Sequence, residues 1–175
     1  MAPDRAMPLL AWAWRHFVLE RVQWRLTWLL VAKFVVGVTG IVFDDGGRVL
    51  LLKHTFRRKY PWGLVSGWVK TGESLVGALQ REIREETSFS VEIDRLFQVR
   101  TDRLRLAMEF VYLCRYTSGS FRANNEVTQA QWCSPDAPPD GLHPQHFPLI
   151  RAAADAGEAN RTADGDAGTA VTVRA

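Results

Sequence analysis

The sequence that decides the fold reads Gly67-Trp-Val-Lys-Thr-Gly-Glu73 and continues, after seven residues, as Arg81-Glu-Ile-Arg-Glu-Glu86. Ser74 precedes an apolar-periodic segment and belongs to the residue types that cap helix N-termini. We therefore predict a helix from Leu75 to Thr87. The acidic residues lie in its last two turns, so their direction relative to its apolar side decides what they can do.

Glu82 and Glu86 project to nearly the same side of the predicted helix as Leu79, because each residue turns a helix by about 100°. Glu85 lies one step around, adjacent to Glu82. Like charges at this spacing repel each other, and partial burial increases the repulsion. A divalent cation compensates such a group, since Mg²⁺ takes carboxylate oxygens while keeping water and phosphate ligands. The alternative is a solvated acidic face balanced by neighbouring arginines, and helix geometry alone does not choose between the two.

The complete pattern from Gly67 to Phe89 resembles the Nudix box of the family that includes the MutT pyrophosphohydrolases. The resemblance implies an α/β fold, a Nudix-type α/β/α sandwich with a mixed sheet. It also implies hydrolysis of a pyrophosphate bond in a nucleoside diphosphate linked to another moiety, or in a nucleoside triphosphate. Mg²⁺ is then the expected cofactor, with Mn²⁺ as the alternative, and a nucleotide-derived small molecule is the expected substrate.

The resemblance also assigns roles to residues of this chain. Gly67 matches the glycine that lets the loop backbone approach the metal, with its carbonyl as a ligand. Arg81 and Glu73 match the pair that steadies the junction between loop and helix, and Glu126, six residues before Trp132, matches a further ligand. The expected metal ligands are Gly67, Glu82, Glu85, Glu86 and Glu126. The expected catalytic residues are Glu82, Glu85, Glu86, Arg81 and Glu73.

A basic run upstream of the box supplies candidates for binding the substrate's phosphates, namely Lys53, His54, Arg57 and Arg58. A solvated basic loop is an equal alternative. Two tryptophans, Trp62 and Trp68, have the chemistry to stack on a base. Aromatic residues that flank a sheet more often belong to its core, so neither receives a role.

Two serines depart from the Nudix box. Ser88 stands where the box has a glycine that ends the helix, and a left-handed conformation there costs a residue with a Cβ about 1–2 kcal/mol. Ser66 stands where many members have a second glycine. Every carboxylate is intact, which favours an active enzyme. The alternative is a nucleotide-sensing Nudix module that has lost turnover.

Outside the box, β-branched and apolar runs predict strands at 34–43, 48–52, 91–100, 104–116 and 127–133, with a turn at Thr101-Asp102 and a short helix at 148–154. Strands on both sides of a central helix favour an α/β layered domain over residues 34–154. Residues 1–33 form an N-terminal extension, in which 8–32 predict an amphipathic helix. Residues 155–175 lack aromatic side chains and predict a disordered tail.

Composition limits the remaining choices. With 175 residues the chain suits one domain, and its net charge of +3 is too weak to favour nucleic acid as a partner. Cys114 and Cys133 lack metal-ligand spacing and are expected as reduced thiols in a cytoplasmic protein.

Charged residues interrupt the apolar N-terminal stretch, so no spanning helix is expected. That stretch could instead lie on a membrane surface, where a lipid-linked diphosphate would be the substrate, or pack on its own domain or a second subunit in a homodimer.

Overall fold

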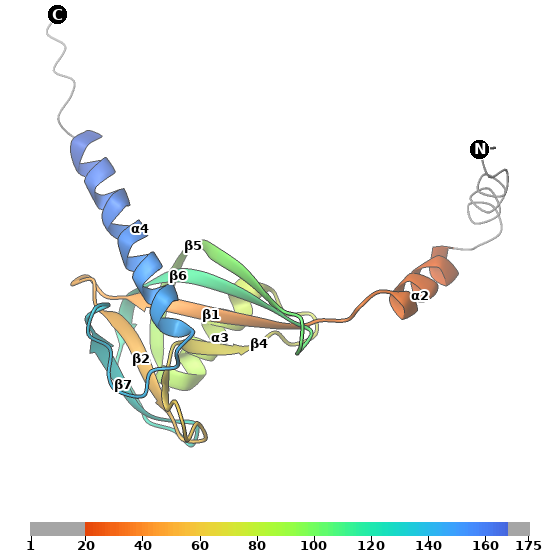
Figure 1. Cartoon of the computed structure of the whole chain (residues 1–175), viewed down its shortest axis with the longest axis horizontal. Helices are drawn as coiled ribbons and strands as arrows, with labels where there is room; N and C mark the ends of the chain where they lie inside the picture. The colour runs from red at the N-terminus through yellow and green to blue at the C-terminus, as the bar shows by residue number, and fades with distance from the viewer. Residues whose placement is uncertain (1–19, 168–175) are drawn as a thin grey trace, which may run out of the picture. The chain divides into compact units, whose positions relative to one another are not determined.

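The computed structural model describes residues 20–167 of the chain, which divide into two compact units (Figure 1). The first unit ends at Phe34 and contains helix α2 (Glu20–Leu30), within the predicted N-terminal helix. The part of that predicted helix before Glu20 lies outside the described residues. The second unit begins at Val35 and contains all the described strands, with helices α3 (Leu75–Thr87) and α4 (His146–Ala167).

The second unit is built on a mixed seven-stranded sheet. Its strands are β1 (Val35–Phe43), β2 (Val49–His54), β3 (Trp62–Gly63), β4 (Val65–Trp68), β5 (Phe89–Asp102), β6 (Ala107–Gly119) and β7 (Val127–Cys133). Strand β1 is central: it pairs in parallel with β6 and antiparallel with β4 and β2. Strand β2 continues the sheet through antiparallel pairs with β3 and β7, and β5 pairs antiparallel with β6.

The two helices of this unit cover opposite faces of the sheet. On one face, Leu79 and Ile83 of α3 pack in a cluster that includes Val42 of β1. On the other face, Ile150 of α4 packs in a second cluster that includes Ile41, the neighbour of Val42. Successive side chains of a strand point to opposite faces, which explains how β1 contributes to both clusters. The predicted α/β/α sandwich with a mixed sheet is confirmed.

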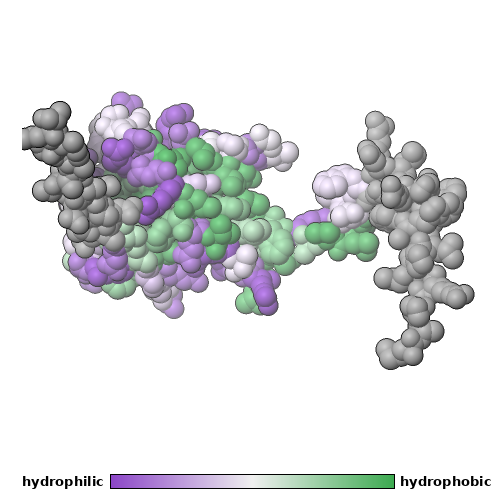
Figure 2. Space-filling view, turned by 90° about the horizontal axis from the view of Figure 1, so that it is seen from above, coloured by the Kyte–Doolittle hydropathy of each residue, from purple (hydrophilic) through white to green (hydrophobic). Residues whose placement is uncertain are grey.

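Strands β3 and β4 were not predicted, because they are short and contain Gly63, Ser66 and Gly67 in place of an alternating apolar pattern. Backbone pairing with β2 and β1 holds them in the sheet. Some apolar side chains also remain on the surface of the unit (Figure 2), among them Leu96 and Val99 of β5. In the described sheet β5 pairs with β6 alone, so it forms an edge.

The turn between β5 and β6 lies further along the chain than the sequence indicates. Thr101 and Asp102 end β5, and the turn spans residues 103–106. The carboxylate of Asp102 accepts hydrogen bonds from the backbone N–H groups of Leu104 and Arg105, at 2.9 and 3.1 Å. Because an aspartate side chain can cap the backbone after it, Asp102 starts this turn from the last position of the strand.

Helix α4 corrects the prediction for the C-terminal part of the chain. It runs from His146 to Ala167 in place of 148–154, so residues 155–167 are helical and not part of a disordered tail. Alanine has the highest helix propensity, and the alanines after Ala153 allow the helix to continue past its last buried contact. Residues 168–175 of the predicted tail lie outside the described residues.

Both ends of α3 behave as the sequence predicts. The hydroxyl of Ser74 accepts a hydrogen bond from the backbone N–H of Gly77 at 3.0 Å. Ser88 ends the helix with φ = 64°, and its N–H donates to the carbonyl of Arg84 at 2.9 Å. The expected left-handed conformation at Ser88 is therefore confirmed, and the helix end keeps its regular form.

Replacing Ser88 with glycine raises the free energy of unfolding by about 1 kcal/mol, because glycine adopts a positive φ without the Cβ penalty. Urea denaturation measures the change. The matched control is Ser90→Gly in the extended strand β5, where glycine costs about 0.5–1 kcal/mol. Equal destabilisation by both substitutions would contradict the strain assigned to Ser88.

Candidate active site

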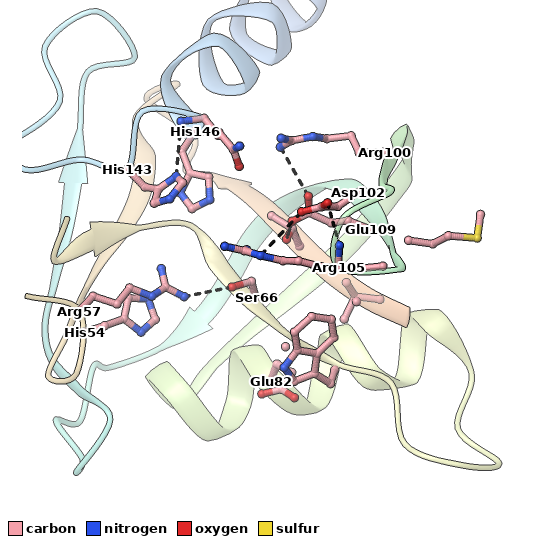
Figure 3. A pocket seen from close by; sticks show the side chains of 18 of the residues that line it. His54, Arg57, Ser66, Glu82, Arg100, Asp102, Arg105, Glu109, His143 and His146 are labelled. Carbon is pink, nitrogen blue, oxygen red and sulfur yellow. Dashed lines mark hydrogen bonds and ion pairs between the residues drawn. The ribbon is translucent and has the colours of Figure 1, made fainter. Parts of the chain in front are cut away.

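The second unit contains a cleft of about 1410 Å³ beside α3, and most of the predicted site residues line it (Figure 3). The lining residues from the predicted set are Arg57, Gly67, Arg81, Glu82, Glu85, Glu86 and Glu126. Glu73 lies behind the lining and contacts Arg81. Two of the proposed phosphate-binding residues, Lys53 and Arg58, are not part of the lining. Lys53 instead lies over the ring of Trp62.

Arg81 joins the loop before α3 to the helix itself. Its guanidinium donates two hydrogen bonds to the carboxylate of Glu73, at 2.8 and 3.0 Å. It also donates to Glu82 at 2.7 Å, to Glu85 at 3.1 Å and to the backbone carbonyl of Trp68 at 3.1 Å. The hydrogen bonds from Arg81 lower the pKa of Glu73 to about 2. The loop and the acidic face are therefore held in a defined arrangement by one side chain.

Gly67 is needed for a close approach of the loop to the acidic helix. A Cβ on Gly67 would lie 2.0 Å from Cδ of Glu82, far inside any real contact. Pairing between Gly67 and Val38 of β1 fixes the loop backbone at this point. The absence of a side chain thus brings the loop backbone directly against the carboxylate of Glu82.

Glu86 is the buried carboxylate of the site, with 6% of its surface exposed. Its Oε2 atom has no hydrogen-bond partner among the described residues. Burial is the main cause that raises the pKa of Glu86, Glu82 and Glu126 also raise it, and Arg57 and the backbone of Ser66 lower it, so that the resulting pKa is about 8. Burying a carboxylate without an opposite charge is energetically unfavourable, so a cation bound at this position would stabilise the ionised form of Glu86.

The donor set fits a hard divalent cation. Within residues 20–167, no three His, Cys, Asp or Glu side chains already converge as a metal cage. The free oxygen of Glu86, the carboxylate of Glu82 and the open backbone at Gly67 nevertheless supply the oxygen atoms that Mg²⁺ prefers. Mg²⁺ keeps several waters and is commonly held by one or two carboxylates, so a complete protein cage is not required.

One wall of the cleft is formed by His54, Arg57, His143 and His146, all labelled in Figure 3, and Arg57 is its charged member. Arg57 is half-buried, and its guanidinium donates to the hydroxyl of Ser66 at 3.5 Å, as Figure 3 shows. Burial lowers the pKa of Arg57, and the negative charge of Glu86 opposes this effect. Arg57 therefore connects the Ser66 loop with the acidic site and is well placed for an anionic group.

Three histidines lie at this wall, and the sequence indicated only His54, as a member of the basic run upstream of the box. His54 is buried with an unpartnered Nε2 atom, and burial lowers its pKa to about 4. The Nδ1 atom of His146 accepts a hydrogen bond from the N–H of Leu64 at 3.1 Å, and burial lowers its pKa to about 3. The ring of His143 lies 5.0 Å from that of His146. Local spacing gives no signal for this group, since its members come from β2 and from the start of α4.

The fold and the cleft together define a class: an α/β/α domain whose central helix presents carboxylates to a glycine-containing loop. The family model described as NUDIX domain matches residues 33–153. The chain therefore belongs to the Nudix family.

Individual relatives agree with this assignment. A MutT-like protein from Streptomyces ambofaciens is 31% identical over 58% of this chain and 64% of its own length. The 8-oxo-dGDP phosphatase NUDT18 from Homo sapiens is 34% identical over 54% of this chain and 31% of its own length. A NUDIX hydrolase structure from Nitrosomonas europaea shares the fold with a TM-score of 0.62 and 22% identity, covering 68% of this chain and 70% of that one. This chain thus spans less than two thirds of these curated relatives.

Proposed function

We propose that this chain hydrolyses a pyrophosphate bond in a nucleotide-derived small molecule, with Mg²⁺ as cofactor and Mn²⁺ as its alternative. The observation that carries the proposal is the carboxylate of Glu86, which is buried with a free oxygen near Glu82 and the backbone of Ser66. A solvated acidic face would not bury this group. The burial of Glu86 therefore favours a metal site over the alternative of a solvated acidic face balanced by neighbouring arginines.

In the proposed mechanism, Glu82 and Glu86 hold the metal, with the Gly67 carbonyl, Glu85 and Glu126 as further candidate ligands. A bound divalent ion polarises a phosphate oxygen and lowers the pKa of a water. Glu86 is suited to accept the proton of the attacking water, because it lines the cleft and its Oε2 atom has no hydrogen-bond partner among the described residues. Arg57 binds a phosphate of the substrate from the opposite wall.

The names of relatives support a nucleotide substrate. They include the 8-oxo-dGDP phosphatase NUDT18 and the NAD-capped RNA hydrolase NudC. Each name describes a nucleotide that carries a diphosphate, and the cleft of this chain combines carboxylates that suit a metal ion with arginines that suit phosphate groups. The alternative of a nucleotide sensor without turnover rests on Ser66 and Ser88. Ser66 accepts a hydrogen bond from Arg57 and Ser88 fits a regular helix end, so neither substitution speaks against catalysis.

Metal removal combined with a substrate panel tests this function. Purified protein is incubated with 8-oxo-dGDP, ADP-ribose and NAD, and the products are separated by chromatography. We expect hydrolysis of at least one substrate with Mg²⁺, loss of that activity with EDTA and its return when Mg²⁺ is restored. Calorimetry that shows tight nucleotide binding without any product would establish the sensor in place of the enzyme.

The N-terminal helix is the basis of a separate proposal about location. Helix α2 exposes Trp24, Trp28 and Leu29, a side-chain chemistry suited to a membrane surface. No helix within the described residues is long and apolar enough to cross a membrane. We expect residues 1–175 to float with anionic liposomes in a density gradient and a chain starting at Lys33 to stay behind. If both remain at the bottom, the helix instead packs on its own domain or in a homodimer, which light scattering distinguishes.

A further inference from the structure

The unit that begins at Val35 contains three tryptophans, and they have different environments. Trp62 is 8% exposed and belongs to the core on the α4 side. Trp132 packs against the core on the α3 side, stacked on Phe89 at 6.1 Å between ring centroids. Trp68 is 59% exposed and lines the cleft. Trp68 therefore has an apolar surface that packing within this unit leaves uncovered.

The backbone of Trp68 is held by hydrogen bonds, and its ring lies against Gly37. Strand β4 pairs Trp68 with Gly37 of β1, and the carbonyl of Trp68 accepts a hydrogen bond from Arg81 at 3.1 Å. The indole lies over Gly37, where an added Cβ would be only 3.3 Å from Cζ3 of the ring. Part of the ring thus rests on the backbone of Gly37 while the remainder faces the cleft and solvent. A fixed ring loses little conformational entropy when a ligand binds to it.

Trp68 also stands next to the proposed reaction centre. It directly follows Gly67, whose backbone lies against the carboxylate of Glu82. Successive side chains of β4 point to opposite faces, so the Trp68 ring lies on the face of Gly37 and Glu82 on the other face, but both residues line the same cleft. A substrate that extends along this cleft from the carboxylates would therefore reach the ring. Phe56 is a second exposed aromatic residue of the cleft, but it lies in the turn after β2 and its ring is 78% exposed. Of these two aromatic residues, Trp68 lies on a strand and therefore has the better-defined position for stacking with a ligand.

We propose that Trp68 is the stacking platform for the nucleobase of the substrate and that it selects nucleotides over diphosphates that carry an alkyl or lipid group. This inference rests on the proposed function and specifies its substrate class. Nucleobases stack on aromatic side chains irrespective of their sequence identity, because every base has a π-face. An alkyl diphosphate has no such face and would gain little from a flat indole.

Steady-state kinetics test the proposal with two substitutions at the same position. Trp68→Leu keeps an apolar side chain over Gly37 and removes the ring, whereas Trp68→Phe keeps a smaller ring. For the best nucleotide of the panel, Trp68→Leu is expected to raise KM about tenfold while kcat changes by less than about twofold, and Trp68→Phe recovers most of the affinity. Phe56→Leu is the control and leaves KM unchanged. Equal KM values for wild type and Trp68→Leu, or a KM rise in Phe56→Leu alone, would overturn the assignment.

Tryptophan fluorescence provides a readout that does not depend on turnover. Titrating the same nucleotide, with Ca²⁺ in place of Mg²⁺, is expected to quench wild-type fluorescence, and Trp68→Phe removes most of the quench. A short alkyl diphosphate is expected to quench neither protein. Quenching lost in Trp68→Phe without hydrolysis in the wild type would uphold the platform while the hydrolase proposal fails. Quenching of equal size in both proteins would reject the platform, whatever the activity.

Discussion

Replacing Glu86 with glutamine is expected to lower kcat about 100- to 1000-fold with Mg²⁺, the range found when one electrostatic group of an active site is removed. Glutamine has the same shape, so the loss reports the charge and not the packing. In the proposed mechanism this charge binds the metal and accepts the proton of the attacking water. Single-turnover kinetics with the best nucleotide of the panel measure the loss.

The stability of the metal-free protein provides a second signature of Glu86. Its carboxyl group is buried with an unpartnered oxygen and burial raises its pKa, so an uncharged glutamine resembles the form that the metal-free domain favours. In EDTA, Glu86→Gln is therefore expected to unfold at the same urea concentration as wild type or at a higher one. Mg²⁺ raises the unfolding midpoint of wild type and has a smaller effect on the variant, because a ligand stabilises only the state that binds it.

Glu92→Gln is the matched control for this substitution, since Glu92 is an exposed residue of β5 paired with Arg115 and does not line the cleft. Its activity and metal response should equal those of wild type. Wild-type activity in Glu86→Gln would remove Glu86 from the mechanism, and the proposed metal site would then lose its central ligand.

Replacing Gly67 with alanine is expected to lower kcat about 100-fold or more. The new Cβ would lie 2.0 Å from Cδ of Glu82, so the carboxylate, the loop or both must move. A misplacement of about 1 Å is enough to reduce a rate about 100-fold. The added methyl is also expected to lower the free energy of unfolding by about 1–3 kcal/mol, as overpacking does. Activity assays and urea denaturation measure the two effects.

Gly157→Ala is the matched control for Gly67→Ala. A Cβ on Gly157 meets no atom within 4 Å, and Gly157 lies in α4, where alanine is favoured over glycine by about 0.5–1 kcal/mol. This variant should keep its activity and unfold at a slightly higher urea concentration. Full activity in Gly67→Ala would show that Glu82 has room to move and does not need its observed position.

The central helix and its acidic face were predictable because both depend on contacts close in sequence. Ser74 caps Gly77, Ser88 closes the turn that begins at Arg84, and the spacing of Glu82 and Glu86 follows from helix periodicity. The predicted C-terminal helix was too short, because the apolar residues that are expected to be buried indicate only its first turns. Alanine-rich continuation depends on backbone propensity, which leaves no periodic pattern.

The assembly of the cleft required the tertiary structure. His54 and His146 are far apart in the sequence and meet only because β2 and the start of α4 lie at the same wall. Arg57 and Arg58 are neighbours with the same chemistry, yet only Arg57 lines the cleft. Which of two adjacent side chains faces a site depends on the elements packed around them.

The family, the central helix and its carboxylates were readable from the sequence, because their spacing is encoded in the 23 consecutive residues from Gly67 to Phe89. The tertiary structure decided which carboxylate is buried without a partner and which tryptophan faces the cleft. Trp62 and Trp68 are the same residue type and lie six positions apart in the sequence. Trp62 is buried in the core cluster on the α4 side, whereas Trp68 lies over Gly37 and is exposed in the cleft. Burial is a property of the packed molecule, since it depends on segments that the local sequence does not specify.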